Sequence, residues 1–244
     1  MGSGARGIKS LVKGRKRQDT YSHNSDDFSD VDSHTTKMSD EDRKIVDSNY
    51  NSNGYFQTWN AFEINEALRY AHDNNVSIED GITKTGDNVE KQMQTIDAMD
   101  RNMKPTNKDM NVIRLADSNY LNRVLSGAVQ SGVLNQDVAD RLEDFAKGFK
   151  GKISDSDLSA LKSALVGGTI HENAYASCTY NLSLKDSAFT GRKIKLDMDV
   201  KAGTKGMFSP TGRESEFVLD RHSGYDVSDV YIGEDGRLVI KVST

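Results

Sequence analysis

Two glutamates, Glu214 and Glu216, stand two residues apart in the stretch RESEFVLDR, directly before the apolar run 217–219. Side chains alternate along a strand, so both carboxylates are expected on one face, with Cα atoms about 6.7 Å apart. At that separation two charges repel by about 2 to 3 kcal/mol at an effective dielectric of about 20. A solvated strand end would screen most of this repulsion. The alternative explanation is that the two carboxylates have separate chemical roles. Residues elsewhere in the chain decide between the two explanations.

Two earlier segments carry further candidate groups. Arg114 lies inside the apolar run VIRLA, and Ser177, Cys178 and Thr179 lie inside YASCTY. A guanidinium fork in a strand is suited to binding phosphate, and hydroxyls can orient a carboxylate. Each feature has an ordinary structural explanation when taken alone, as a strand-edge arginine or as common strand residues. Their order along the chain, arginine, then hydroxyls, then Glu-x-Glu, is the informative observation.

Other chemistries find little support in the sequence. GSGARG at 2–7 has the spacing of a dinucleotide-binding loop, but no strand precedes it. The five histidines are scattered and Cys178 is the single cysteine, so no metal site is predicted and no internal disulfide is possible. A chain of this kind is expected to work in a reducing cytosol. No activating histidine accompanies Cys178, which disfavours a nucleophilic cysteine.

The 244 residues and net charge of −5 suit one globular domain with a polar tail. Residues 1–50 are basic and then acidic, with too little apolar surface to offset the entropy of ordering, so they are predicted to be a disordered tail. Residues 51–244 are long enough to form one globular domain with a core. No stretch is apolar enough to span a membrane, and no Sec-type signal follows the basic start. The tail's cations are candidates for contact with nucleic acid or with a packaging or delivery partner: Arg6, Lys9, Lys13, Arg15, Lys16 and Arg17.

Apolar periodicity predicts helices first and strands afterwards. Helical spacing occurs in 55–75, 87–103, 134–149 and 154–168, with Asn135 and Ser154 as N-caps of the last two. A short strand is expected at 111–116. After residue 168 the segments are rich in β-formers, and KIKLDMDV at 193–200 alternates strictly. Further strands are expected at 174–180, 215–220, 226–232 and 237–242. This order indicates an α+β fold with a mostly antiparallel sheet.

The three chemical segments, in this order, resemble the mono-ADP-ribosyltransferases of the arginine, Ser-Thr-Ser, Glu-x-Glu class, which includes bacterial toxins and bacteriophage enzymes. TIDAMDRNMKPTNKDMNVIRLAD is similar to the family's helix, Pro-bearing link and arginine strand, and KAGTKGMFSPTGRESEFVLDR is similar to its turn, variable loop and Glu-x-Glu strand. The resemblance covers about residues 55–244. Cys178 departs from the family's central serine, and Leu115 stands where many members have glycine. Cys178 is expected on the opposite strand face from Ser177.

The resemblance implies N-terminal helices packed on a two-sheet core, and it implies roles for named residues. Arg114 would hold the phosphates of NAD, and Glu216, oriented by Ser177, would stabilise the positive charge that forms on the ribose. Glu214 would align and deprotonate the acceptor, and Glu at this position goes with guanidinium acceptors in the family. NAD is thus expected as a substrate, without a metal. The expected NAD-binding residues are Arg114, Ser177, Thr179, Phe189 and Glu216, with Phe208 as a second candidate for stacking.

The sequence therefore predicts an enzyme that transfers ADP-ribose from NAD to an arginine of a target protein and releases nicotinamide. The resemblance implies that the enzyme acts in the cytoplasm of a bacterial target cell. Carriage in a phage particle is one route by which it could be delivered there. Two alternatives stay open. One is an inactive structural or virion-associated protein with the same fold, and the other is an NAD glycohydrolase, in which water replaces the protein acceptor.

Overall fold

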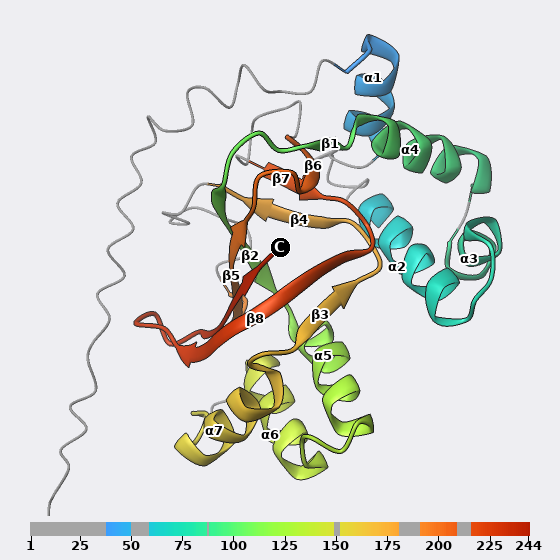
Figure 1. Cartoon of the computed structure of the whole chain (residues 1–244). Helices are drawn as coiled ribbons and strands as arrows, with labels where there is room; N and C mark the ends of the chain where they lie inside the picture. The colour runs from blue at the N-terminus through green and yellow to red at the C-terminus, as the bar shows by residue number, and fades with distance from the viewer. Residues whose placement is uncertain (1–37, 50–58, 87, 149–151, 181–190, 209–215) are drawn as a thin grey trace, which may run out of the picture.

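The computed structural model of the chain describes most of the sequence after residue 37 (Figure 1). The described residues are 38–49, 59–86, 88–148, 152–180, 191–208 and 216–244. Within them, no helix is long and apolar enough to cross a membrane. The same residues hold no group of three or more histidine, cysteine or acidic side chains that could bind a metal.

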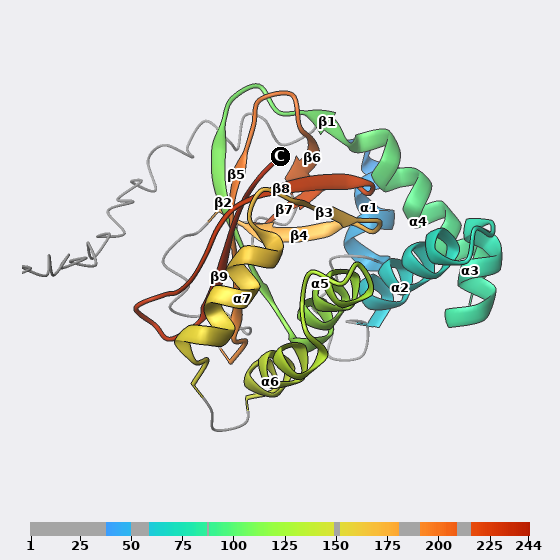
Figure 2. The same cartoon turned by 60° about the horizontal axis from the view of Figure 1, so that its bottom comes forward.

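The helices form two groups (Figures 1 and 2). The first group packs against one face of the strands, and the second gathers at one end of the sheet. The first group consists of α1 (Asp40–Asn49), α2 (Trp59–Asp73), α3 (Ile78–Thr85) and α4 (Val89–Asn102), and the second of α5 (Ser118–Gln130), α6 (Gln136–Ala146) and α7 (Asp155–Leu165).

Helix starts follow the capping residues in the sequence. Asn135 accepts a hydrogen bond from the backbone N of Asp137 at 2.8 Å, and Ser154 accepts one from the backbone N of Asp157 at 3.1 Å. Both bonds satisfy amides that have no partner inside the helix. Two N-caps predicted from sequence, those of α6 and α7, are therefore confirmed. The glycine after α7, Gly167, has a φ of +85°, which lets the chain leave the helix toward the sheet.

All described strands belong to one hydrogen-bonded sheet with the order β1-β6-β7-β4-β2-β5-β9-β8-β3. Its neighbouring pairs are antiparallel except β5 and β9, which run parallel. The expected separation into two sheets is therefore wrong, because β2 pairs with β4 on one side and with β5 on the other. The strands are β1 (Lys104–Pro105), β2 (Met110–Ala116), β3 (Thr169–Glu172), β4 (Ala176–Thr179), β5 (Ile194–Val200), β6 (Lys205–Phe208), β7 (Glu216–Leu219), β8 (Ser223–Ile232) and β9 (Leu238–Ser243).

The sheet is strongly curled (Figure 1). Strand β3 lies at its far edge, four strands beyond β2 in the order, yet β3 is joined to β4 by residues 173–175 alone. A connection of three residues can join β3 to β4 only if the sheet bends back on itself and brings the two strands close together. The curl brings β3 and the helices α2 and α5 around the start of β4.

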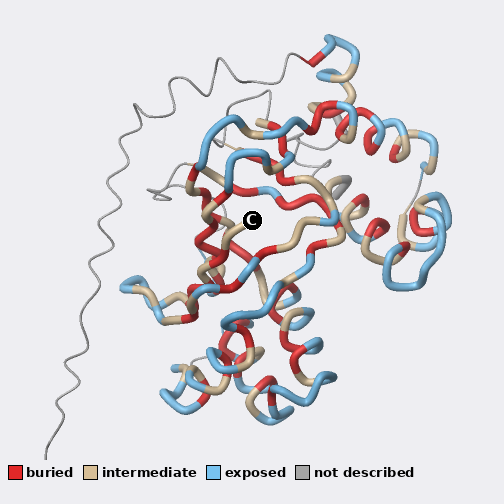
Figure 3. Tube along the Cα trace, in the orientation of Figure 1, coloured by how far each residue is buried: buried red, intermediate tan, exposed pale blue. Residues whose placement is uncertain are grey.

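Two hydrophobic clusters lie on the two faces of the strands. Figure 3 shows that buried residues are concentrated along the strands and recur along the helices. The inner cluster fills the curl and extends under α5, α6 and α7, and it includes the predicted alternating residues of β5, each with 0% exposure: Ile194, Leu196, Met198 and Val200. The outer cluster joins α1 to α4 to the opposite face of β4, β6 and β7 through Tyr175, Met207 and Val218. The strictly alternating pattern in the sequence thus identified the inner face correctly.

The folded part begins before the boundary expected at residue 51. Helix α1 lies inside the predicted tail, and Met38 and Val46 are buried against α4. Arg101 of α4 donates to Asp42 at 2.7 Å, and Asn102 donates to the same carboxylate at 3.0 Å. A polar helix of this length gains its stability from packing on a neighbour, which composition alone does not reveal.

Gly206 occupies a position in β6 where a side chain has no room. A Cβ there would lie 2.2 Å from Cζ of Phe217 and 2.8 Å from the carbonyl oxygen of Val218. Gly206→Ala is expected to lower the free energy of unfolding by about 1 to 3 kcal/mol, because the backbone of β6 or β7 must shift. Gly127→Ala is the matched control, since its Cβ would meet nothing within 4 Å in α5 and should stabilise the helix by about 0.5 to 1 kcal/mol. Urea denaturation that gave both variants the same sign of change would contradict this account.

Candidate active site

Ser177 and Glu216 meet on adjacent strands. Strands β4 and β7 are antiparallel, with Thr179 opposite Glu216 and Ser177 opposite Val218. The side chains of Ser177, Thr179 and Glu216 therefore share one face of the sheet. Ser177 Oγ donates a short hydrogen bond to Glu216 Oε1. Ser177 is exposed and Glu216 is partly exposed, so this carboxylate is held in place and accessible to a ligand.

Cys178 points away from that pair. It is 4% exposed in the inner cluster, and its Sγ lies 3.6 Å from Sδ of Met198. Burial raises the pKa of the Cys178 thiol to about 12, so it stays protonated at neutral pH. The prediction that Cys178 occupies the opposite face from Ser177 is confirmed, and the departure from a central serine lies in the core rather than beside Glu216.

Arg114 lies on β2, next to β4 in the sheet. Ile113 pairs with Thr179, which puts Arg114 beside Cys178 and on the inner face. Burial is the largest influence on Arg114 and opposes its charge, but Glu172 together with Cys178, Tyr120 and Tyr225 raises the pKa overall, so Arg114 stays a cation. Its Nη1 atom is buried and has no hydrogen-bond partner among the described residues. Such a donor is costly unless water or a ligand satisfies it.

The structure thus brings Ser177 and Glu216 into contact and places Arg114 on the next strand along. Strands β7, β4 and β2 are neighbours, so the backbones of Glu216 and Arg114 are about 10 Å apart, two strand spacings. No bond joins Arg114 to Ser177 or Glu216 within the described part of the chain. Ser177 and Glu216 share one face of the sheet, whereas Arg114 lies with Cys178 on the other face, so the structure does not bring Arg114 together with the pair.

Two expected site residues, Glu214 and Phe189, lie outside the described residues. Phe208, the other candidate for stacking, ends β6 and is partly buried. Its ring centroid lies 4.9 Å from that of Phe217 and 5.8 Å from that of Tyr180. These contacts place Phe208 in an aromatic cluster at the end of the inner core.

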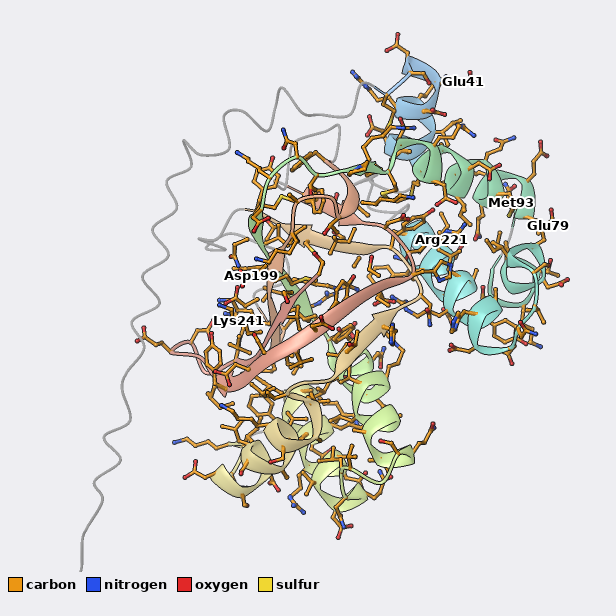
Figure 4. The ribbon with its side chains drawn as sticks, in the orientation of Figure 1. Glu41, Glu79, Met93, Asp199, Arg221 and Lys241 are labelled. Carbon is orange, nitrogen blue, oxygen red and sulfur yellow. The ribbon has the colours of Figure 1, made fainter. Side chains whose placement is uncertain are left out.

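A cluster that the sequence did not reveal anchors the strands of the Ser177–Glu216 pair. The hydroxyl of Tyr175, a fully buried residue, donates to Asp100 Oδ1 at 2.5 Å. Arg221, labelled in Figure 4, donates to the two oxygens of Asp100 at 3.2 and 2.8 Å. Burial disfavours the charge on Arg221, but the bonds to Asp100 prevail and raise its pKa. Asp100 of α4 thereby ties the start of β4 to the end of β7.

A cleft of about 1020 Å³ lies between α2, α5 and β3, and its lining includes neither Ser177, Glu216 nor Arg114. Glu172, at the end of β3, lies in its wall five residues before Ser177. Arg69 and Arg123 contribute guanidinium groups to the same walls. Such a cleft has the size of a dinucleotide site and donors suited to phosphate.

Comparison with known proteins gives the family. The model of the ADP-ribosyltransferase exoenzyme family matches residues 25–244. The fold is similar to that of the C3stau2 protein of S. aureus, solved with NAD, at a TM-score of 0.61 and 20% identity, covering 89% of this chain and 92% of that one. The Clostridium limosum C3 exoenzyme (TM-score 0.60, 22% identity, 89% and 91% covered) and an ADP-ribosyltransferase of Clostridium botulinum (0.57, 20%, 89% and 92%) are similar to the same extent. A search of curated protein sequences finds no significant match. The chain belongs to the ADP-ribosyltransferase exoenzyme family.

Proposed function

We propose that this ADP-ribosyltransferase transfers the ADP-ribose of NAD to the guanidinium group of an arginine in a target protein. The observation that carries the proposal is the Ser177–Glu216 hydrogen bond, which fixes one carboxylate at an accessible position of the sheet. The sequence adds Glu214, two residues earlier in the chain. By resemblance to the family, a glutamate there accompanies guanidinium acceptors.

The chemistry follows from where charge develops. When the bond between ribose C1′ and the nicotinamide nitrogen breaks, its electron pair leaves with nicotinamide and positive charge builds on the ribose. A fixed carboxylate at Glu216 stabilises that charge more in the transition state than in bound NAD. The arginine nitrogen then forms its bond to C1′, and its proton passes to Glu214 as general base. Ser177 keeps the Glu216 carboxylate oriented throughout.

Labelled NAD and a set of acceptors test this proposal. The purified protein is incubated with labelled NAD and a peptide that carries one arginine, or the same peptide with lysine or asparagine in its place. Label on the arginine peptide alone, located by mass spectrometry, supports the proposal. Label on another side chain would overturn the arginine acceptor while leaving the transferase activity. Release of nicotinamide without label on any peptide would favour the NAD glycohydrolase instead.

Glu214→Gln separates acceptor chemistry from NAD cleavage. Loss of a general base is expected to lower ADP-ribose transfer to agmatine, a small guanidine acceptor, by about 100-fold. Release of nicotinamide into water should change little, because Glu216 is intact. Glu41→Gln, an exposed change on α1, serves as the control and should alter neither rate. Unchanged transfer by Glu214→Gln would remove the base role from this residue.

A further inference from the structure

Strand β3 is an edge strand whose outer side is open. It pairs with β8 alone among the described strands. The backbone N of Val227 donates to the carbonyl oxygen of Gly168 at 2.9 Å, so this carbonyl points toward β8. Because backbone groups alternate in direction along an antiparallel strand, those of Thr169 and His171 point away from β8. Neither residue makes a backbone hydrogen bond on that outer side within the described part of the chain.

The outer edge of β3 is also accessible. Thr169 and His171 are both exposed, and both line the cleft between α2, α5 and β3. Figure 1 shows α5 next to β3. A strand edge with unpaired N–H and C=O groups is a template for hydrogen bonding with another extended chain. The cleft, at about 1020 Å³, is large enough to admit one.

Apolar side chains line the cleft at the start of β3. Leu165 ends α7 and its carbonyl oxygen accepts from the backbone N of Gly168, directly before β3. Val133, which follows α5, is 57% exposed in the same lining. An added strand would direct every second side chain against this wall. The apolar residues of the lining are Val124, Ala128, Val133, Ala164, Leu165, Ile170 and Val227.

The cleft is basic at the other end of β3. Arg69 of α2 donates from Nε to Glu172 Oε1 at 2.9 Å, and Arg123 of α5 is exposed in the same lining. Two carboxylates line the cleft. Glu172 is 3% exposed and is committed to Arg69, and Asp73 Oδ1 lies 3.2 Å from His72 Nδ1 at the end of α2. Guanidinium groups bind carboxylates through paired hydrogen bonds, so this end of the cleft is complementary to an acidic side chain.

We propose that the outer edge of β3 binds an extended segment of a partner protein as an added strand. The segment has a carboxylate at the end near Glu172 and apolar side chains at alternate positions toward Gly168. Hydrogen bonds to the backbones of Thr169 and His171 hold the segment, and the carboxylate and apolar side chains select it. This surface determines which proteins the enzyme holds, and it is separate from the chemistry at the Ser177–Glu216 pair.

Titration with a synthetic peptide, in the absence of NAD, tests the edge directly. The probe is acetyl-Glu-Thr-Val-Thr-Val-Thr-amide, whose glutamate lies opposite Glu172 when the peptide runs antiparallel to β3. Saturating peptide should slow amide hydrogen exchange at Thr169 and His171 by about 10-fold, measured by NMR, and leave Ile170 unchanged because its amide faces β8. N-methylation of the second and fourth peptide residues should abolish binding. Lysine in place of the peptide's glutamate should weaken binding by about 10-fold.

Variants of the protein test the same surface. His171→Pro removes an N–H that points away from β8 and keeps the pairing with β8, so it should weaken peptide binding by about 10-fold. His171→Thr is the matched control, because it keeps the amide. Val133→Asp should also weaken binding, by placing a charge in the apolar wall. Val166→Asp is its control, since Val166 is 39% exposed and lies outside the lining.

Each arm has an outcome that overturns part of the proposal. Absence of saturable peptide binding to the wild-type protein, or equal binding of the N-methylated peptide, would overturn strand addition. Equal affinity for the lysine peptide would overturn the preference for a carboxylate. A dimer of the free protein that His171→Pro dissociates, seen by sedimentation, would assign the edge to a second copy of this chain. Thermal melting establishes that each variant is folded, and the N-methylated peptide tests the edge without any substitution.

Discussion

Replacing Glu216 with Gln is expected to slow the release of nicotinamide from NAD by about 1000-fold. The substitution removes the carboxylate charge that stabilises the positive charge forming on the ribose in the transition state. The substitution keeps the size of the side chain, and the amide oxygen of Gln still accepts a hydrogen bond from Ser177 Oγ. The charge is removed, and with it the interaction that grows as the ribose becomes positive. Binding of NAD should change far less than its cleavage.

The measurement is single-turnover nicotinamide release, with Kd for NAD determined separately. Glu234→Gln is the matched control, because Glu234 is exposed in the turn between β8 and β9 and takes no part in the Ser177–Glu216 pair. It should have wild-type rates. The catalytic role of Glu216 fails if Glu216→Gln loses rate and NAD affinity to the same degree, or retains more than about a tenth of the rate.

Asp100→Ala is expected to lower the free energy of unfolding by about 3 to 4 kcal/mol. The change leaves the hydroxyl of the fully buried Tyr175 without its carboxylate partner, and it leaves Arg221, whose side chain is 23% exposed, without its counter-ion. A single loss of this size exceeds what exposed ion pairs contribute, because one carboxylate serves two partly or fully buried groups.

The same change is expected to slow nicotinamide release by about 10- to 100-fold in the folded enzyme, since small displacements of catalytic groups are costly. Tyr175 precedes Ser177 by two residues and Arg221 follows Glu216 by five, so Asp100 sets where both strands lie. Asp97→Ala, an exposed change one turn earlier on α4, is the control and should leave stability within about 0.5 kcal/mol. Urea denaturation and kinetics below the transition separate the two effects. A destabilised variant with a wild-type rate would show that Asp100 stabilises the fold without positioning the pair.

Local features of this fold were predictable because local physics determines them. Alternation along a strand predicted which residues of β5 face the core, and it predicted that Cys178 and Ser177 lie on opposite faces of β4. Capping chemistry gave the starts of α6 and α7. The pairing of Ser177 with Glu216 came from the family resemblance and not from spacing, since 39 residues separate them.

The features that sequence reasoning missed depend on contacts between distant segments. Asp100 bonds Tyr175 across 75 positions and Arg221 across 121, and an aspartate on the polar side of a helix carries no signal of either bond. Helix α1 is polar in composition and is held by packing on α4. The continuity of the sheet depends on β2 pairing on both edges, and no pattern within β2 distinguishes one partner from two.

The connection between β3 and β4 is three residues long and is held to α2 at both ends. Residues 173–175 join the strand that ends in Glu172 to the strand that carries Ser177, and both ends of this connection are pinned to α2. Asn173 contacts His72, and the backbone N of Tyr175 donates to Asn65. Glu172, which accepts from Arg69 at 2.9 Å, is therefore separated from Ser177 by four residues of a backbone that is anchored to α2. Insertions are tolerated in many surface loops, but an insertion in this connection would displace Ser177 from Glu216.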